Sequence, residues 1–340
     1  MTMEYRPLGR TGVHVSKLCL GAMMFGAWGN TDHDDCIRII HRALDAGINF
    51  VDTADVYSAG ESEEILGKAL KGRRDDVVLA TKLGVPMDDD PNHRGGSRRW
   101  IITEVENSLR RLSTDYIDLY QLHRPDPDTD IDETLAALTD LVEQGKVRYI
   151  GSSSFSAGQI VEAQWVACDR RLERFRTEQP PYSILVRGIE LDVLPTAQRH
   201  GMGILTYSPL AGGWLSGSWS ADSSPASPAR QRLAARFDMS LPENQRKLQA
   251  VQRLAKLADE AGMSLIALAI AFVINHPAVT SAIIGPRTME QLDSQLPAAD
   301  VTLDASLLDR VDEIVQPGVN LNPADTSYGE QVFRPSLRRR

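Results

Sequence analysis

Eight short apolar runs, each followed by an amphipathic helical segment, constrain the fold of this chain more than any other feature of its sequence. The runs are rich in Val, Ile and Leu, end in polar residues or glycine, and lack the alternation of a half-exposed strand. Strands buried on both faces and joined by helices form parallel βαβ units. The predicted strands are Leu18–Gly21, Ile48–Asp52, Val77–Lys82, Tyr116–Leu122, Val147–Ser152, Arg176–Gln179, Gly203–Tyr207 and Ser281–Gly285.

The segments between the runs carry signals for the starts and ends of helices. A helix is predicted over Asp32–Gly47, because the aspartate can cap its first turn and the glycine can end it. Asp130 with Glu133 resembles a capping box, in which each side chain bonds the backbone N–H of the other residue. Two further helices are expected over Pro242–Gly262 and Ser264–Asn275. Helical spacing in these segments supports the assignment of the runs to strands.

Eight βα units close naturally into a (β/α)8 barrel, an α/β fold of the TIM-barrel type that typically takes ~250 residues. Because the chain has 340 residues, a single barrel domain over residues 1–340 must carry additions. We expect them in an N-terminal β-hairpin at about residues 5–16, a long loop at 210–244 and a C-terminal tail at about 315–340. A doubly wound open sheet is the rival fold, and the absence of a GxGxxG motif after any predicted strand disfavours it.

Composition argues against several classes of protein. The formal net charge of -9 and the pI near 5.3 disfavour a nucleic-acid partner, whose binding surface needs an excess of Lys and Arg. The three cysteines are widely spaced without a CxxC pair, so we expect reduced core thiols and neither a disulfide framework nor a zinc site. The N-terminus lacks the apolar core of a signal peptide, and even the run Leu265–Ile274 is too short to span a bilayer. We therefore expect a soluble cytoplasmic protein without a membrane partner.

Polar residues at the ends of three consecutive predicted strands indicate a chemical role. In a barrel of this kind, the C-terminal strand ends and the loops after them converge on one pocket. Asp52 ends the second strand with Tyr57 in its loop, Lys82 ends the third strand, and His123 follows the fourth. Each residue alone has an ordinary explanation, as a turn cap, a surface ring, a solvated charge or a structural histidine. Four ionisable residues at one mouth favour a catalytic site.

Together these residues are suited to deliver a proton to an alkoxide. A Tyr hydroxyl has a reference pKa of about 10, and the Lys82 ammonium is expected to lower the pKa of Tyr57. Asp52 is expected to hold that ammonium, and His123 to donate a hydrogen bond that orients a substrate carbonyl. The set supplies no electrons, so the reaction needs a hydride donor.

Other strand ends suit a nicotinamide dinucleotide. Ser153 and Gln179 can bond a carboxamide, and Tyr207 can stack on a ring. After the eighth strand, Thr288–Gln291 resembles a capping box with Arg287 directly before it. Free backbone N–H groups beside a guanidinium predict a phosphate site, and a plain N-cap next to a surface arginine is the alternative.

As a whole, the chain resembles the aldo-keto reductase superfamily, and most closely the bacterial members and the branch that contains potassium-channel beta subunits. The resemblance extends from about Leu8 to Leu296. Its motifs are FVDTADVY at 50–57, ATKLG around Lys82, LYQLHRPD around His123, IGSSSF at 150–155, EQPPYS at 178–183, YSPLAGG at 207–213 and IIGPRTMEQL at 283–292.

The resemblance implies direct hydride transfer between NADPH and an aldehyde or ketone, a reaction of the alcohol-dehydrogenase type that uses no metal. It also implies a catalytic tetrad with a tyrosine general acid/base, made up of Asp52, Tyr57, Lys82 and His123. The implied cofactor-binding residues are Ser153, Ser154, Gln179, Tyr207, Ser208, Leu210, Gly212, Gly285, Arg287, Gln291 and Gln295. Ser154 and the Ser294-Gln295 pair depart from the family, which commonly has Asn and Glu-Asn there. Arg287 favours NADPH over NADH.

Three hypotheses of function are compatible with these residues. The first is a carbonyl reductase that acts on a small-molecule aldehyde or ketone, and the second is a nicotinamide-binding, redox-sensing regulatory subunit with little turnover. The third makes Lys82 a Schiff-base nucleophile for aldol chemistry. Four apolar residues either wall a substrate pocket or pack the top of the barrel: Met24, Phe25, Trp28 and Trp214. No feature of the sequence indicates an oligomeric state.

Overall fold

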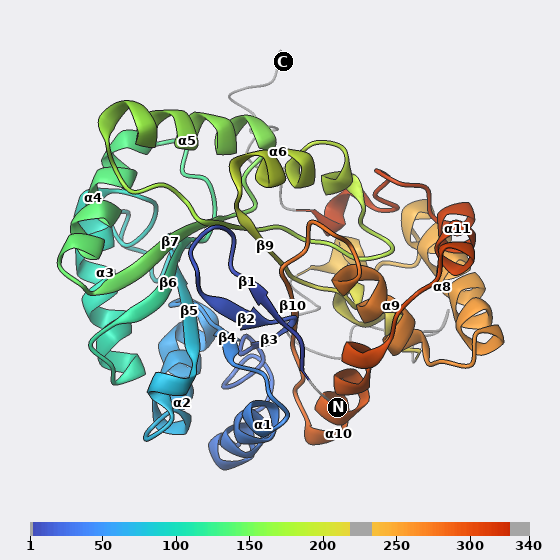
Figure 1. Ribbon diagram of the computed structural model, residues 1–340. Helices are drawn as coiled ribbons and strands as arrows, with labels where there is room; N and C mark the ends of the chain where they lie inside the picture. Colours follow the sequence, from blue (N-terminus) through green and yellow to red (C-terminus); the bar gives the residue numbers. More distant parts are fainter. Residues whose placement is uncertain (1–2, 218–232, 327–340) are drawn as a thin grey trace.

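A closed barrel of parallel strands forms the centre of the molecule (Figure 1). The computed structural model describes residues 3–217 and 233–326. The barrel strands are β3 (Leu18–Gly21), β4 (Phe50–Asp52), β5 (Val78–Leu83), β6 (Ile117–Leu122), β7 (Val147–Ser153), β8 (Thr177–Gln179), β9 (Gly203–Thr206) and β10 (Ser281–Ile284). Each strand pairs with the next one in sequence, and β10 closes the ring against β3. Every strand overlaps a predicted one, which confirms the (β/α)8 barrel.

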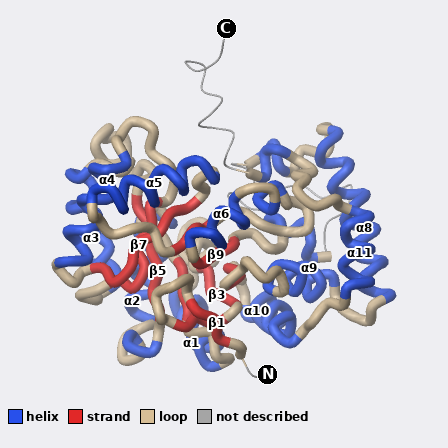
Figure 2. Tube along the Cα trace, turned by 45° about the horizontal axis from the view of Figure 1, so that its top comes forward, coloured by secondary structure: helices blue, strands red, loops and turns tan. Residues whose placement is uncertain are grey.

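Helices surround the barrel and return the chain from each strand to the next (Figures 1 and 2). Their bounds are α1 (His33–Asp45), α2 (Glu61–Ala69), α3 (Arg98–Leu112), α4 (Ile131–Glu143), α5 (Ala157–Arg170), α6 (Val193–His200), α8 (Pro242–Glu260), α9 (Leu265–Ile274), α10 (Met289–Gln295) and α11 (Ala305–Ile314). The first six follow β3 to β8 in turn, while α8 and α9 lie between β9 and β10. This order is the βαβ alternation that the apolar runs predict.

Two predicted helix starts have different outcomes. The Asp32 carboxylate accepts a hydrogen bond from Asp35 N at 3.0 Å, so it caps α1 as predicted. The predicted capping box of α4 is wrong, because the Asp130 side chain makes no cap hydrogen bond. Glu133 instead accepts a hydrogen bond from Arg98 N at 3.0 Å, at the start of the neighbouring α3. A tertiary contact has replaced the local one.

The predicted N-terminal hairpin consists of β1 (Tyr5–Pro7) and β2 (His14–Ser16), and it covers the amino-terminal end of the barrel (Figure 1). Its turn docks on the segment before β9, where Arg10 N donates a hydrogen bond to Gly201 O at 3.1 Å. Gly9 has φ +58°, and a Cβ there would lie 2.7 Å from Gly203 N. The close approach therefore requires glycine. Leu8 and Val15 point into the barrel and join its interior apolar cluster.

The two other predicted additions lie partly outside the described residues, namely at 218–232 and 327–340. The described part of the long loop contains the 3-10 turns η4 (Ala211–Ser216) and η5 (Ala234–Arg236), and α8 begins before the predicted loop end at residue 244. Lys247 on α8 is fully buried, and its ammonium lies 2.8 Å from the Asp325 carboxylate and 3.0 Å from Arg236 O. This lysine joins the loop, the helix and the start of the tail.

Inward-facing side chains change from apolar to polar in one step along three neighbouring strands. Residues two apart on a strand face the same side, so on these strands an apolar residue of the interior cluster has a polar one directly above it. The three pairs are Phe50 with Asp52, Ala80 with Lys82, and Leu119 with Gln121. The barrel therefore has an apolar floor, closed by the hairpin, and a polar mouth at the carboxyl ends of its strands.

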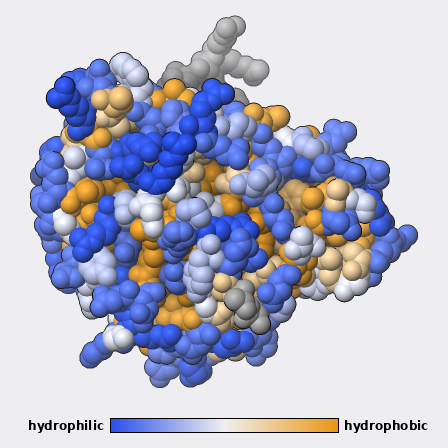
Figure 3. Space-filling model, in the orientation of Figure 1, coloured by the Kyte–Doolittle hydropathy of each residue, from blue (hydrophilic) through white to orange (hydrophobic). Residues whose placement is uncertain are grey.

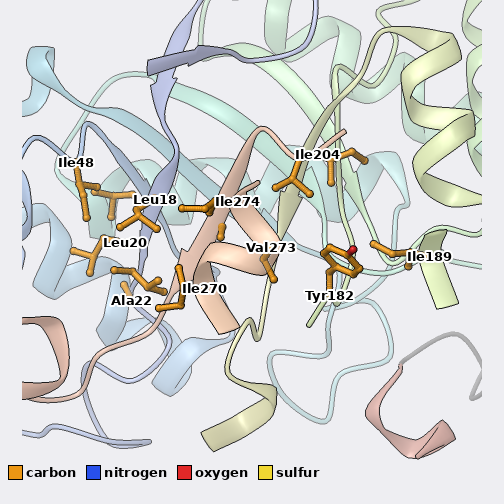
Figure 4. Packing of buried hydrophobic residues seen from close by; sticks show 14 of the residues in the cluster. Leu18, Leu20, Ala22, Ile48, Tyr182, Ile189, Ile204, Ile270, Val273 and Ile274 are labelled. Carbon is orange, nitrogen blue, oxygen red and sulfur yellow. The ribbon is translucent and has the colours of Figure 1, made fainter. Parts of the chain in front are cut away.

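A larger apolar core lies between the barrel and the helices. Leu18 and Leu20 of β3 pack in the same cluster as Ile270 and Ile274 of α9 (Figure 4). In the described part of the chain, no single helix is long and apolar enough to cross a membrane; only α8 and α9 taken together, with a 94° bend between them, pass that test. The face seen in Figure 3 mixes hydrophilic and hydrophobic side chains. Two cysteines are buried as expected, but Cys168 is exposed, which corrects the prediction for that thiol.

Candidate active site

Lys82 lies at the centre of the polar cluster in the barrel mouth. Its ammonium donates hydrogen bonds to Asp52 Oδ1 at 2.5 Å, Thr53 O at 2.7 Å and the Tyr57 hydroxyl at 3.3 Å. Lys82 is fully buried and Asp52 is only 3% exposed. A buried charge needs a partner and satisfied hydrogen bonds, and the three oxygen acceptors meet that need. The structure thus brings three of the four predicted catalytic residues into direct contact.

The second oxygen of Asp52 is bonded from across the barrel. Oδ2 accepts hydrogen bonds from Gln179 Nε2 at 2.9 Å and from Gln121 Nε2 at 3.2 Å. The Gln179 amide nitrogen, predicted to face a carboxamide, is therefore engaged by Asp52. Gln121 is missing from the predicted site. Its place on the strand, two residues before His123 and on an inward-facing position, is the signal that identifies it.

The Tyr57 ring is fixed by the turn that follows it and by two other rings. Ser58 and Ala59 have φ of 51° and 56°, a left-handed conformation that non-glycine residues adopt at a cost. The His123 ring meets the Tyr57 ring edge-on, with centroids 5.7 Å apart and planes at 82°. Trp28 lies on another side at 5.9 Å. His123, the fourth predicted catalytic residue, is thereby placed beside the phenol.

Burial changes the protonation of this cluster. It raises the pKa of Tyr57 above its ordinary value, and the Lys82 ammonium opposes that rise without overcoming it. The predicted net lowering of the Tyr57 pKa is therefore wrong, because the sequence does not reveal how fully the hydroxyl is buried. Burial also lowers the pKa of Lys82, but Asp52 and Tyr57 outweigh it, so the net pKa is raised. The lysine keeps its proton at neutral pH.

His123 is held in its neutral form. Burial, together with the positive charges of Arg124 and Lys82, brings its pKa well below 6.5. Its Nδ1 atom is buried and has no hydrogen-bond partner among the described residues. A neutral imidazole retains one N–H donor, which it can offer to an oxygen in the mouth.

A second buried network supports the Tyr57 segment from outside the barrel. Arg111 donates to Glu63 Oε2 at 2.6 Å and to Glu104 Oε1 at 2.5 Å, and Thr81 on β5 donates to Glu63 Oε1 at 2.6 Å. Asp55, two residues before Tyr57, is also buried, and burial with the nearby Glu63 and Glu104 charges raises its pKa well above the ordinary value. One guanidinium thus balances Glu63 and Glu104, while Asp55 Oδ2 is buried without a hydrogen-bond partner among the described residues.

The turn after β7 carries two of the predicted nicotinamide residues. Ser153 Oγ donates to Gln179 O at 2.9 Å, and Ser154 N donates to the same oxygen at 3.1 Å. Ser154 has φ +59°, and its hydroxyl lies 3.3 Å from the Tyr207 hydroxyl. The structure therefore brings Ser153, Ser154, Gln179 and Tyr207 to one edge of the mouth.

Two charged residues beside this turn are missing from the predicted site. Glu178 is fully buried and accepts hydrogen bonds from Ser152 Oγ at 2.5 Å and Phe155 N at 3.0 Å. Burial raises its pKa to about 7. Arg124, directly after His123, donates to Ser154 Oγ at 3.1 Å. A carboxylate adjoining Gln179 on a buried strand was the available signal for Glu178, and the place after His123 was the signal for Arg124.

The remaining predicted cofactor residues line the segments after β9 and β10. Ser208 and Gly212 have φ of 59° and 68°, and Leu210 lies between them. Thr288 caps Gln291 N at 3.3 Å, but the Gln291 amide oxygen accepts from Arg287 N at 2.9 Å. The predicted reciprocal capping box is therefore only half formed. The glutamine bonds the backbone of Arg287, the residue before the cap, and the Arg287 side chain is exposed.

The donors and acceptors along this edge fit a nicotinamide dinucleotide. Gln295 Oε1 is buried without a hydrogen-bond partner among the described residues, and an amide oxygen can accept from an adenine amino group. A Cβ at Gly285 would meet nothing within 4 Å, so open space borders the end of β10. The exposed guanidinium of Arg287 suits a phosphate.

Most of the predicted apolar wall lies in the core instead of the mouth. Phe25 and Trp214 are fully buried in the larger core cluster. Trp214 stacks on Phe237 with ring planes 4° apart. Trp28, by contrast, borders the mouth, because its ring lies against the Tyr57 ring. Packing at the top of the barrel is therefore the better explanation for Phe25 and Trp214.

Comparison with known proteins agrees with the residue pattern. The chain matches the aldo/keto reductase family over residues 17–316. It is 43% identical over 323 residues to the uncharacterized oxidoreductase YrpG of Bacillus subtilis (strain 168), covering 92% of this chain and 96% of that one. It is 37% identical over 341 residues to the aldo-keto reductase YhdN of the same organism, covering 99% of each chain. A probable voltage-gated potassium channel subunit beta of Arabidopsis thaliana is 37% identical over 326 residues, covering 92% and 97%.

Proposed function

The chain belongs to the aldo/keto reductase family, whose members are oxidoreductases that use nicotinamide cofactors, and we propose that this member reduces aldehydes and ketones with NADPH. The observation that carries the proposal is the contact of the Lys82 ammonium with both Asp52 and the Tyr57 hydroxyl, in a mouth that His123 also lines. In the proposed reaction a carbonyl compound, NADPH and a proton become an alcohol and NADP+. The chemistry supplied by bound NADPH is a hydride, which reduces the carbonyl carbon by two electrons.

Tyr57 is the proposed proton donor to the carbonyl oxygen. Its raised pKa keeps the phenol protonated at neutral pH, which is the form that reduction requires. Once the proton leaves, the adjacent Lys82 ammonium stabilises the phenolate, and Asp52 keeps that ammonium in place. The neutral His123 donates a hydrogen bond to the same carbonyl oxygen and orients it toward Tyr57.

The proposed cofactor contacts follow from the donors already described. Ser153, Ser154 and Gln179 would hold the carboxamide, Gln179 through its amide oxygen because its amide nitrogen already donates to Asp52, and Tyr207 would lie against the ring. Arg287 would bind a phosphate, which supports NADPH over NADH because the two cofactors differ by the adenosine 2′-phosphate. Residues Ser208 to Gly212, with Gly285, Gln291 and Gln295, would contact the rest of the dinucleotide.

The structure does not favour Schiff-base chemistry at Lys82. A nucleophilic lysine must be unprotonated, whereas the pKa of Lys82 is raised and its ammonium donates to three oxygens. The same contacts serve proton transfer through Tyr57. The lysine is therefore an electrostatic partner in the proposed mechanism.

Replacement of Tyr57 by Phe tests the proposal. Loss of a positioned general acid typically costs 10²- to 10⁴-fold, so kcat for a panel of aldehydes should fall by about that factor. Fluorescence titration with NADPH should give the same Kd as the wild type, because the ring and its packing remain. Unchanged turnover in Tyr57→Phe would refute the assignment of the proton donor. Tight NADPH binding by the wild type with negligible turnover would instead favour a redox-sensing regulatory subunit.

A further inference from the structure

Arg124 places a guanidinium between the acid/base pair and the two serine hydroxyls. Its Nη1 atom donates to His123 O at 2.7 Å, to Ser154 Oγ at 3.1 Å and to Ser153 Oγ at 3.4 Å. These acceptors fix one nitrogen of the guanidinium. Nε and Nη2 have no partner among the described residues, and neither is buried away from solvent. One side of the guanidinium is therefore held by the protein, and the side formed by Nε and Nη2 is available to bind a ligand.

No carboxylate of the described chain balances this charge at ion-pair distance. Arg111 and Arg187, two other arginines with little exposure, are each paired with two carboxylates. The acceptors of Arg124 are instead a backbone carbonyl and two hydroxyls. Withdrawing a cation from water without an anion is unfavourable, so an anion bound at the free edge would be stabilised.

The remaining charges of the mouth leave this cation dominant. Lys82 and Asp52 neutralise each other, and His123 is neutral. Glu178 is buried beneath the turn, is bonded by Ser152 and Phe155, and forms no ion pair with Arg124 within 4.0 Å; the attraction of Arg124 contributes less to lowering its pKa than those hydrogen bonds do. The positive charge of Arg124 also lowers the pKa of Tyr57 and of His123 in part, which shows that its field reaches the reacting groups.

We propose that Arg124 binds a carboxylate on the substrate, so that the site selects aldehydes and ketones that also carry a carboxylate. The inference rests on the proposed function and names its substrate class. An arginine fork matches a carboxylate better than a lysine does, because two parallel N–H donors meet two oxygens. The reduction itself is unchanged, with hydride added at the carbonyl carbon and a proton at its oxygen. The carboxylate stays intact and serves to orient the molecule.

The kinetic test compares 4-carboxybenzaldehyde with the neutral 4-methylbenzaldehyde, which has a similar shape. The wild type should show the higher kcat/KM for the acid. In Arg124→Met, the ratio of kcat/KM for the acid to that for the neutral aldehyde should fall about 10- to 100-fold, the usual effect of losing hydrogen bonds to a charged group. Arg124→Lys should lose less, because it keeps the charge without the fork.

Arg287→Met is the matched control, because it removes another arginine near the mouth of the same barrel. It should weaken NADPH binding and leave the ratio between the two aldehydes unchanged. If Arg124→Met instead weakens NADPH binding and slows both aldehydes equally, Arg124 organises the cofactor turn and the proposal is wrong. A wild type with no preference for the acid would also overturn it.

A binding measurement separates this inference from the proposed function. In the Tyr57→Phe background, calorimetry with 4-carboxybenzaldehyde and NADPH reports binding whether or not the enzyme turns over. Adding Arg124→Met to that background should weaken the binding of the acid about 10- to 100-fold. If the wild type reduces neither aldehyde but this loss of binding is seen, the proposed function fails and the carboxylate site stands. Equal binding in both variants would refute the carboxylate site.

Discussion

Gln179 on β8 donates its amide N–H to Asp52 on β4 at 2.9 Å, across the interior of the barrel. Gln121 bonds the same carboxylate oxygen, and Lys82 bonds the other. A carboxylate with hydrogen bonds on both oxygens is suited to hold a neighbouring group and not to take a proton from substrate. Asp52 is therefore best understood as the residue that positions Lys82.

Replacement of Lys82 by Met should separate the two roles of the ammonium, which are to lower the pKa of Tyr57 and to pair with the buried Asp52. Without its charge the pKa of Tyr57 should rise further, because the cation opposes the effect of burial. The pH at which alcohol oxidation reaches half its maximum should therefore move upward, and kcat should fall. Asp52 would be left buried and unpaired, which costs about 3–5 kcal/mol of unfolding free energy. Urea unfolding and a pH profile of kcat measure the two effects.

The double variant Asp52→Asn/Lys82→Met is the control for that experiment. It removes both charges, so most of the lost stability should return while the activity stays low. Recovery of activity together with stability would show that the Lys82 ammonium serves only the fold.

Glu178→Gln should change the pH dependence of stability. Below about pH 4.5 the carboxyl is protonated in both the folded and the unfolded chain and contributes no pH dependence. Between about 4.5 and 7 the unfolded chain loses this proton first, so the free energy of unfolding falls by about 3 kcal/mol, given a folded-state pKa of about 7 against the ordinary 4.5. The stability difference between variant and wild type should grow by that amount from pH 4.5 to 8.

Urea unfolding at pH 4.5, 6 and 8 measures this difference for Glu178→Gln. The exposed Glu162 on α5 supplies a matched control, and Glu162→Gln should differ from the wild type by no more than about 0.5 kcal/mol at each pH. A difference for Glu178→Gln that does not vary with pH would contradict the raised pKa.

Arg111→Met should destabilise the chain by about 3–5 kcal/mol, because it leaves Glu63 and Glu104 buried without their cation. Arg110, the preceding residue, is exposed, so Arg110→Met should change stability by less than about 0.5 kcal/mol. Urea unfolding at neutral pH compares the two. Similar losses for both variants would show that the Glu63 and Glu104 pairs contribute little.

Gly9→Ala tests the hairpin that closes the barrel floor. The added Cβ would lie 2.7 Å from Gly203 N at φ +58°, and the combined strain and displacement should cost about 2–3 kcal/mol. Gly12 has φ +82° with nothing within 4 Å of an added Cβ, so Gly12→Ala should cost only about 1–2 kcal/mol of backbone strain. Thermal unfolding measures the difference. kcat should be unchanged in both, since the hairpin lies at the opposite end from the mouth.

The eight strands were predictable because their signal is local. Each apolar run is short, is followed by a segment with helical spacing, and ends in a polar residue or glycine. The local sequence therefore identifies both the strand and its end. The grouping of Asp52, Lys82 and His123 then follows from topology, since consecutive parallel strands present their ends at one mouth. Local signals fail where a distant partner competes, as when Glu133 bonds Arg98 N instead of its own helix start.

Residues whose roles depend on contacts between strands could not be assigned in the same way. Glu178 acts through Ser152 and the Phe155 backbone, and its place on a buried strand does not by itself reveal these two contacts. The direction of the Tyr57 pKa was predicted wrongly for the same reason, because a nearby cation is visible in the strand order while the depth of burial is not. The sequence identifies the charged residues near a group, but the effect of burial on its pKa can be judged only from the folded structure.

The closure of the ring by β10 against β3 has a consequence for the nascent chain. Ala282 of β10 pairs with Leu18 of β3, a contact between residues 264 apart. At about 5–20 residues per second, the ribosome takes roughly 10–50 s to make the intervening chain. During that interval β3 can pair with β4 on one side only, and its other edge has no strand beside it. An unpaired edge is prone to pair with other chains, so the open edge of β3 is a site of aggregation risk during synthesis.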